Sequence, residues 1–167
     1  MQSFVLKIQN NIRGNECMII KKTMNTTVQK LHDFILEMVV QDIRNTSNEQ
    51  SCQTINTSDI KEGFTYTKSI LNKTGKQGSV KTRIETLKPG QYQVSFTSAN
   101  GVNTVQYSYN QSSEDDIELV YEEHFESDAK LKNMNHAFMS TLYKRSNRRR
   151  INALLNQIEQ LVNEQPV

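Results

Sequence analysis

Five consecutive segments in the middle of this 167-residue chain alternate between apolar and polar residues. In the segment 102–110, for example, polar residues separate Val105, Tyr107 and Tyr109. A period of two places alternate side chains on opposite faces of a β-strand, and it is typical of an antiparallel sheet with one covered and one solvated face. The predicted strands span residues 64–71, 79–88, 91–99, 102–110 and 116–126.

Short, turn-rich connections join these segments. Pro89-Gly90 suits a type II turn, because proline fixes φ at the second position and glycine accepts positive φ at the third. Asn100-Gly101 suits a type I′ hairpin, which needs positive φ at both central residues. Strands joined in this way usually lie side by side. The sequence therefore predicts an antiparallel meander whose five strands are adjacent in chain order.

A strand over residues 18–24 and a helix over 27–44 precede the meander. Thr26 and Gln29 have the spacing of a capping box, which predicts the start of the helix. The apolar residues of this helix recur at steps of three and four, but they cover a wide face. We therefore expect either one helix covered on more than one side or a pair of short helices, followed by a polar connection over 45–62.

A long helix over residues 131–163 is predicted to close the chain. At about 1.5 Å per residue it spans about 50 Å, enough to cross a five-stranded sheet. A sheet with one apolar face must be covered by another layer, so we expect this helix to cover it, with Phe138 and Leu142 facing the strands. Its two apolar stripes are about half a turn out of phase, so the helix either bends near Ser146-Asn147 or buries a wider face.

The length fits one domain, which we place at residues 18–163. Residues 1–17 hold one short alternating run before a Gly-Asn break, so we expect an N-terminal extension, dispensable for folding up to residue 16; residues 164–167 form a tail. No apolar run approaches the roughly 20 residues of a membrane-spanning helix. The first residues lack the basic start and long apolar run of a secretory signal. These features predict a cytoplasmic protein.

Net charge and cysteine spacing limit the expected partners. The net charge of +2 argues against general binding of polyanions. Cys17 and Cys52 form no CxxC pair and have no histidine at zinc-like spacing, so we expect two thiols and no metal or cofactor. Residues 144–150 hold five cations, for which phosphate or RNA binding is one interpretation. Because no aromatic residues are interleaved with these cations, they favour a solvated helix face over a nucleic-acid site.

The order of these elements resembles the helix-grip architecture of the START and polyketide-cyclase (SRPBCC-like) superfamily. Three stretches resemble, more specifically, a small uncharacterised family of Gram-positive bacteria known as a domain of unknown function. They are Glu62-Gly63-Phe64-Thr65-Tyr66, Val120-Tyr121-Glu122-Glu123-His124-Phe125-Glu126, and Met139 through Lys144 with Arg148-Arg149-Arg150. The resemblance covers about residues 18–162. It implies an α+β fold in which a curved antiparallel meander sheet wraps a long C-terminal helix, with a short helix pair after the first strand.

The resemblance implies no residue roles, because that family has no established catalytic residues. Its members lie near sugar phosphotransferase components, which implies a context for the protein and no activity. The superfamily usually has six meander strands after the helices, whereas this sequence shows five.

Glu123 is the most unusual polar residue of the predicted sheet. It falls on the same face as Leu119 and Tyr121, which should point inward. A carboxylate there is costly unless it is paired or close to solvent. Glu123 would be either the polar group of a ligand pocket, with Lys68 and His136 as partners, or a residue at the solvated end of the sheet.

Four tyrosines cluster on the predicted inner face, namely Tyr66, Tyr107, Tyr109 and Tyr121. They would either line a site for a small ligand, with apolar rings and one hydroxyl each, or fill a core with their hydroxyls at its rim. The candidate ligand-binding residues are therefore Tyr66, Lys68, Tyr107, Tyr121, Glu123 and His136. The sequence identifies no catalytic residue and no metal ligand.

Three functions follow from these features. The first, which we expect, is a small-molecule-binding or sensory domain with a closed cavity for an apolar or amphipathic ligand and no assigned reaction. The second is a protein-interaction or adaptor domain with a filled core, which the family context would link to sugar phosphotransferase systems. The third is an enzyme of cyclase or hydratase type that uses Glu123 and a tyrosine.

Overall fold

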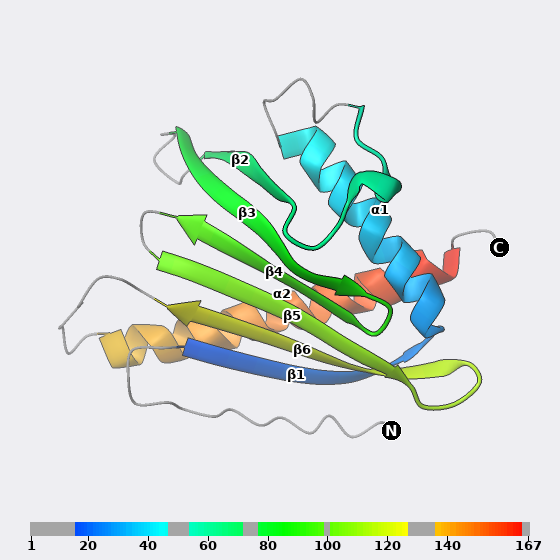
Figure 1. Cartoon of the computed structure of the whole chain (residues 1–167). Helices are drawn as coiled ribbons and strands as arrows, with labels where there is room; N and C mark the ends of the chain where they lie inside the picture. The colour runs from blue at the N-terminus through cyan, green and yellow to red at the C-terminus, as the bar shows by residue number, and fades with distance from the viewer. Residues whose placement is uncertain (1–15, 47–53, 72–76, 99–100, 127–135, 165–167) are drawn as a thin grey trace.

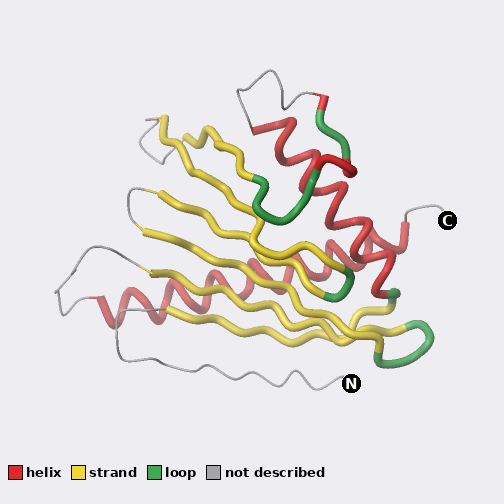
Figure 2. The backbone as a smooth tube through the Cα atoms, viewed as in Figure 1, coloured by secondary structure: helices red, strands yellow, loops and turns green. Residues whose placement is uncertain are grey.

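The computed structural model describes residues 16–46, 54–71, 77–98, 101–126 and 136–164 of the chain (Figure 1). In chain order its elements are β1 (Glu16–Asn25), α1 (Val28–Thr46), the 3-10 helix η2 (Thr57–Asp59), β2 (Thr65–Leu71), β3 (Gln77–Lys88), β4 (Gln91–Ser98), β5 (Gly101–Gln111), β6 (Asp116–Glu126) and α2 (His136–Glu164). The strands form one curved sheet, and α2 runs across it (Figure 1, Figure 2). The predicted α+β helix-grip architecture is confirmed.

The sheet has six antiparallel strands in the order β1-β6-β5-β4-β3-β2. The five predicted meander strands are therefore adjacent in chain order, as expected. The first strand completes the sheet beside β6, where Ile20 pairs with Tyr121. Glu16 and Cys17 pair with β6 as well, so β1 begins two residues before the predicted strand. The assignment of the preceding residues to a dispensable extension stays a prediction.

Between β1 and η2, the described residues contain one continuous helix, α1, and not the predicted pair of short helices. Its buried residues are Leu31, His32, Phe34, Ile35, Val39, Val40 and Ile43. The wide apolar face is explained by three sets of neighbours, since α1 contacts strands β2 and β5, the helix α2 and the turn η2. The first of the two alternatives, a helix covered on more than one side, is therefore correct.

The capping residue of α1 differs from the predicted one. The Thr27 hydroxyl accepts a hydrogen bond from the Lys30 backbone N–H at 3.3 Å, which makes Thr27 the N-cap. Thr26 instead belongs to the turn after β1, where its backbone N–H bonds to the Met24 carbonyl oxygen at 3.1 Å. The Gln29 side chain donates to Asp33 and closes no capping box. The predicted Thr26–Gln29 capping box is therefore wrong, and the N-cap lies one residue later than predicted.

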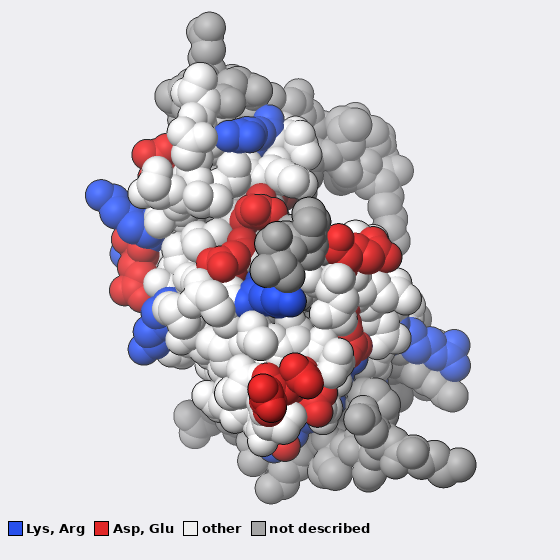
Figure 3. All heavy atoms as spheres, turned by 90° about the vertical axis from the view of Figure 1, so that its right-hand side faces the viewer, with Lys and Arg blue, Asp and Glu red and all other residues white. Residues whose placement is uncertain are grey.

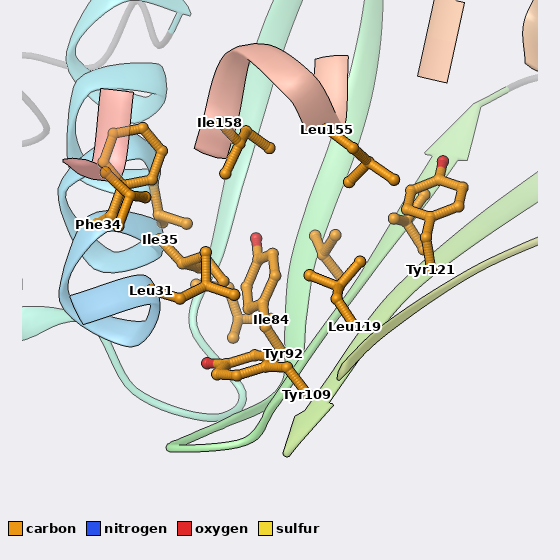
Figure 4. Packing of buried hydrophobic residues seen from close by; sticks show 14 of the residues in the cluster. Leu31, Phe34, Ile35, Ile84, Tyr92, Tyr109, Leu119, Tyr121, Leu155 and Ile158 are labelled. Carbon is orange, nitrogen blue, oxygen red and sulfur yellow. The ribbon is translucent and has the colours of Figure 1, made fainter. Parts of the chain in front are cut away.

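The core lies between the sheet and the two helices (Figure 4). From α2 it receives Ile151, Leu155, Ile158 and Val162, which recur at helical spacing. These side chains belong to one buried cluster with apolar residues of the strands, including Ile84, Val94 and Leu119, on the face that the alternation predicted to be covered. The predicted contacts of Phe138 and Leu142 fall on side chains outside the described residues.

Charged residues are mixed on the surface. On the side shown in Figure 3, acidic and basic side chains are interspersed with uncharged ones. In the predicted basic run, Arg149 and Arg150 are exposed. In the part of the chain that the structure describes, no helix is long and apolar enough to cross a membrane.

Candidate functional site

A cavity of about 570 Å³ lies between the inner face of the sheet and both helices, and it is partly open to solvent. Strands β2, β4, β5 and β6 form its floor, and α1 and α2 form its walls. The lining is mainly aliphatic and aromatic, with a few polar side chains. A volume of this size lies within the range of about 300–1,000 Å³ that is usual for sites of small ligands.

Five of the six candidate ligand-binding residues line this one cavity. They are Tyr66, Lys68, Tyr107, Tyr121 and Glu123. The side chain of the sixth, His136, lies outside the described residues. The alternation of the strands was sufficient to select these residues, because it assigns each side chain to a face of the sheet.

Asp42 of α1 organises the polar end of the cavity near β2. Its carboxylate accepts a hydrogen bond from the Tyr66 hydroxyl at 2.5 Å and forms an ion pair with Lys68. The Lys68 ammonium also lies 5.1 Å from the centre of the Phe96 ring, within the range of a cation–π contact. Lys68 is therefore held by Asp42, and its predicted pairing with Glu123 is wrong.

Glu123 is the centre of a second cluster of polar side chains, which come from β5, β6 and α2. Its Oε1 accepts a hydrogen bond from Asn103 Nδ2 at 2.9 Å. Its Oε2 accepts from the Tyr121 hydroxyl at 3.1 Å and from Asn147 Nδ2 of α2 at 3.3 Å. The carboxylate is thus a half-buried group of the cavity wall, and its role as the polar group of a ligand pocket stays a prediction.

Tyrosine rings connect the two polar groups along the cavity floor. The Tyr107 ring lies 6.0 Å from the Tyr92 ring and 5.2 Å from the Tyr121 ring, the latter edge to face. Burial, with the Glu123 charge as second cause, raises the pKa of Tyr107 to about 12. Burial also raises the pKa of Tyr66, Tyr92 and Tyr121 above the usual range. These phenols therefore remain protonated at neutral pH and can donate hydrogen bonds.

Tyr109 differs from the other predicted tyrosines. It is completely buried and does not line the cavity. Its hydroxyl lies 3.3 Å from Nδ1 of His32, which is itself buried on α1. Tyr109 is therefore a core residue, whereas the other three tyrosines line the cavity.

The sequence interpretation missed several polar lining residues, among them Asp42, Asn103 and Arg150. It also missed Asn147, which donates to Glu123 from α2. Asn103 had a signal, since it alternates with Val105 and Tyr107 on the inner face. Asp42 follows the helical stripe that includes Ile35 and Val39, but only the tertiary fold reveals its contact with β2. Which residues of α2 face the cavity depends on the rotation of the helix about its axis. The sequence did not determine this rotation, because the two apolar stripes of the helix are out of phase.

No group of three metal-ligating side chains occurs among the residues that the structure describes. Cys17 is free, and burial, with the Glu122 charge as second cause, raises the pKa of its thiol. A thiol of this kind is protonated and weakly reactive at neutral pH. Cys52 lies outside the described residues.

A curved antiparallel sheet that wraps a long C-terminal helix, with a cavity between them, is the helix-grip fold. The family model of DUF3284, a domain of unknown function, matches residues 18–144. The chain belongs to this family. No curated protein has a sequence that matches that of the chain.

Solved structures with little sequence similarity share the fold. Ara h 8.0201 has a TM-score of 0.59 and 10% identity, with 91% of this chain and 100% of the other covered. Norcoclaurine synthase from Thalictrum flavum has a TM-score of 0.58 and 8% identity, with 99% and 100% covered. Protein SA2116 of unknown function from Staphylococcus aureus has a TM-score of 0.54 and 10% identity, with 92% and 97% covered. At this level of identity the similarity establishes the fold alone.

Proposed function

We propose that this protein binds a small amphipathic molecule in the cavity between the sheet and the two helices. The observation that carries the proposal is the cavity itself, with about 570 Å³ of space, apolar and aromatic walls and two separate polar groups. A site of this composition holds the body of a ligand by apolar contact and orients it by a few hydrogen bonds. Norcoclaurine synthase has the same fold, and its name describes an enzyme that makes a small molecule. This similarity supports the proposal.

The cavity also argues against the hypothesis of an adaptor domain with a filled core. That hypothesis requires a filled core, because only its surface would act. A filled core would leave no such space between the sheet and the helices. The cavity is partly open to solvent, however, and not closed as the sequence led us to expect. A link to sugar phosphotransferase systems remains an expectation from the family context. The proposal assigns no reaction.

Native mass spectrometry of freshly purified protein tests the proposal directly. We expect a bound small molecule, or, after its removal, saturable binding of the uncharged apolar dye Nile red with one site per chain. Val105→Phe fills the cavity floor and should abolish dye binding. Val102→Phe makes the same change on the outer face of the same strand and should leave it intact.

A second variant, at the mouth of the cavity, keeps the test valid if Val105→Phe fails to fold. Leu154 lines the cavity but is 37% exposed, so Leu154→Trp should narrow the entrance without disturbing the core. It should weaken dye binding while the circular dichroism spectrum is retained. Equal dye binding by the wild type, Val105→Phe and Leu154→Trp would contradict the proposal.

A further inference from the structure

Asn103 and Glu123 meet on the cavity wall, and their contact fixes the orientation of the asparagine amide. Nδ2 donates to Glu123 Oε1 at 2.9 Å, whereas the flipped amide would place its oxygen against the carboxylate. The amide oxygen, Asn103 Oδ1, is buried and has no hydrogen-bond partner among the residues that the structure describes. Buried acceptors without a partner are rare and costly. The amide therefore has an unused acceptor beside a carboxylate.

The Glu123 carboxylate can also accept a further hydrogen bond. Its described hydrogen-bond donors, Asn103, Tyr121 and Asn147, are all uncharged. Oε1 accepts only the Asn103 bond within the described part of the chain, and a carboxylate oxygen can accept two. Glu123 Oε1 and Asn103 Oδ1 are thus an acceptor pair that one group with several N–H donors would bridge.

Among the side chains that the structure describes, the charged groups around this pair come from three elements. Lys68 of β2 is engaged by Asp42 of α1, at the other polar group of the cavity. Arg150 of α2 lines the same cavity but is exposed, so solvent screens its charge. Neither cation forms an ion pair with Glu123 among the described contacts.

Aromatic rings add to the attraction for a cation. Tyr107 and Tyr121 stand edge to face at 5.2 Å beside Glu123, and Phe96 pairs with Asn103 across the strands. The faces of such rings carry negative partial charge and attract cations, more strongly where water is excluded. Lys68 already uses the Phe96 ring in this way.

From this arrangement we infer that the ligand of the cavity carries a protonated amine, which binds Glu123 Oε1 and Asn103 Oδ1 together. The inference rests on the proposed function, because it names the ligand class of the same cavity. An ammonium group has three donors and no acceptor, so it satisfies both oxygens. An alcohol offers one donor, and an anionic group meets two acceptors and is repelled.

Three probes with the same apolar chain test the inference: octylamine, octanol and octanoate. Each is titrated against the whole protein by displacement of the uncharged dye Nile red and by calorimetry. We expect octylamine to bind at least about tenfold more tightly than octanol, a difference typical of a charge-assisted bond in a partly buried site. Octanoate should bind most weakly.

Variants test whether the acceptor pair causes the preference for octylamine over octanol. Glu123→Gln should reduce the affinity for octylamine to that for octanol, and Asn103→Ala should reduce it in part. Glu122→Gln makes the same charge change on the outer face of β6 and should leave the preference intact. Arg150→Gln should change octylamine binding little, because solvent screens the charge of this exposed side chain.

The outcomes separate this inference from the proposed function. If octanol displaces the dye but octylamine binds no more tightly, the amine inference is wrong and the ligand-binding function stands. Retention of the amine preference in Glu123→Gln also overturns the inference. If neither the dye nor any of the three probes binds, both the proposed function and the inference fail.

Discussion

Lys22 of β1 and Glu159 of α2 form an ion pair of 2.6 Å, although only 6% of the Lys22 side chain is exposed. The same ammonium donates to Asn156 Oδ1 at 2.7 Å. The sheet edge and the C-terminal helix are therefore joined by directed polar contacts in addition to apolar packing. A buried cation that is satisfied in this way fixes the position of the helix against the strand.

Loss of this amine should destabilise the fold. Lys22→Met leaves the Glu159 carboxylate without its cation, and because that carboxylate is 27% exposed we expect a cost of about 2–3 kcal/mol, at or below the lower end for a broken buried pair. Lys21→Met is the matched control, since Lys21 is exposed on the next position of the same strand. Urea unfolding measures both variants. Equal stabilities would show that the pair does not hold α2.

Two adjacent leucines of α2 should respond differently to truncation. Leu155 is fully buried and Leu154 is 37% exposed. Leu155→Ala should cost about 2–5 kcal/mol of unfolding free energy, as for other buried leucines. Leu154→Ala should cost less than about 1 kcal/mol but alter dye binding at the cavity mouth. The opposite order of stabilities in urea would mean that α2 is rotated about its axis relative to this structure.

Two glycines with positive φ provide a test of backbone strain. Gly63 has φ of 83° and open space where a Cβ would lie, whereas Gly90 has φ of 90° and a Cβ there would meet the Tyr109 carbonyl oxygen at 3.2 Å. Gly63→Ala should cost about 1–2 kcal/mol, from the left-handed backbone alone. Gly90→Ala should cost more, because it adds a close contact with β5. Thermal unfolding compares the two, and a larger loss at Gly63 would contradict the geometry.

The buried phenols predict a loss of stability at alkaline pH. Burial raises the pKa of Tyr107 and of Tyr109 to about 12, whereas an unfolded tyrosine ionises near about 10. Because the folded pKa is raised, the stability from these groups is complete below pH 10 and falls as the pH rises toward 12. Phenolate absorbance and circular dichroism, recorded together, should change in one transition. Ionisation of all tyrosines near pH 10 in a folded protein would exclude the predicted burial.

The sequence predicted the strands well, because alternation is local and each side chain reports its own face. The same pattern placed Tyr107, Tyr121 and Glu123 toward one cavity. What it could not supply were contacts between elements. Asp42 and Lys68 lie on a helix and a strand that meet only in the folded chain, so their ion pair has no local signal. The single long α1 was ambiguous for the same reason, since its extra apolar residues are explained by contacts with four different elements.

The pairing of β1 with β6 also determines when the fold can be completed. Ile20 lies opposite Tyr121, so a hundred residues of chain must be made before the first strand acquires its partner. Closure of so long a loop is entropically costly, and non-local strand pairing slows folding. During synthesis, β1 therefore emerges with one apolar face and no neighbour on the sheet. Limited proteolysis of ribosome-bound chains that end before residue 116 should cleave this strand, and chains that extend beyond α2 should protect it.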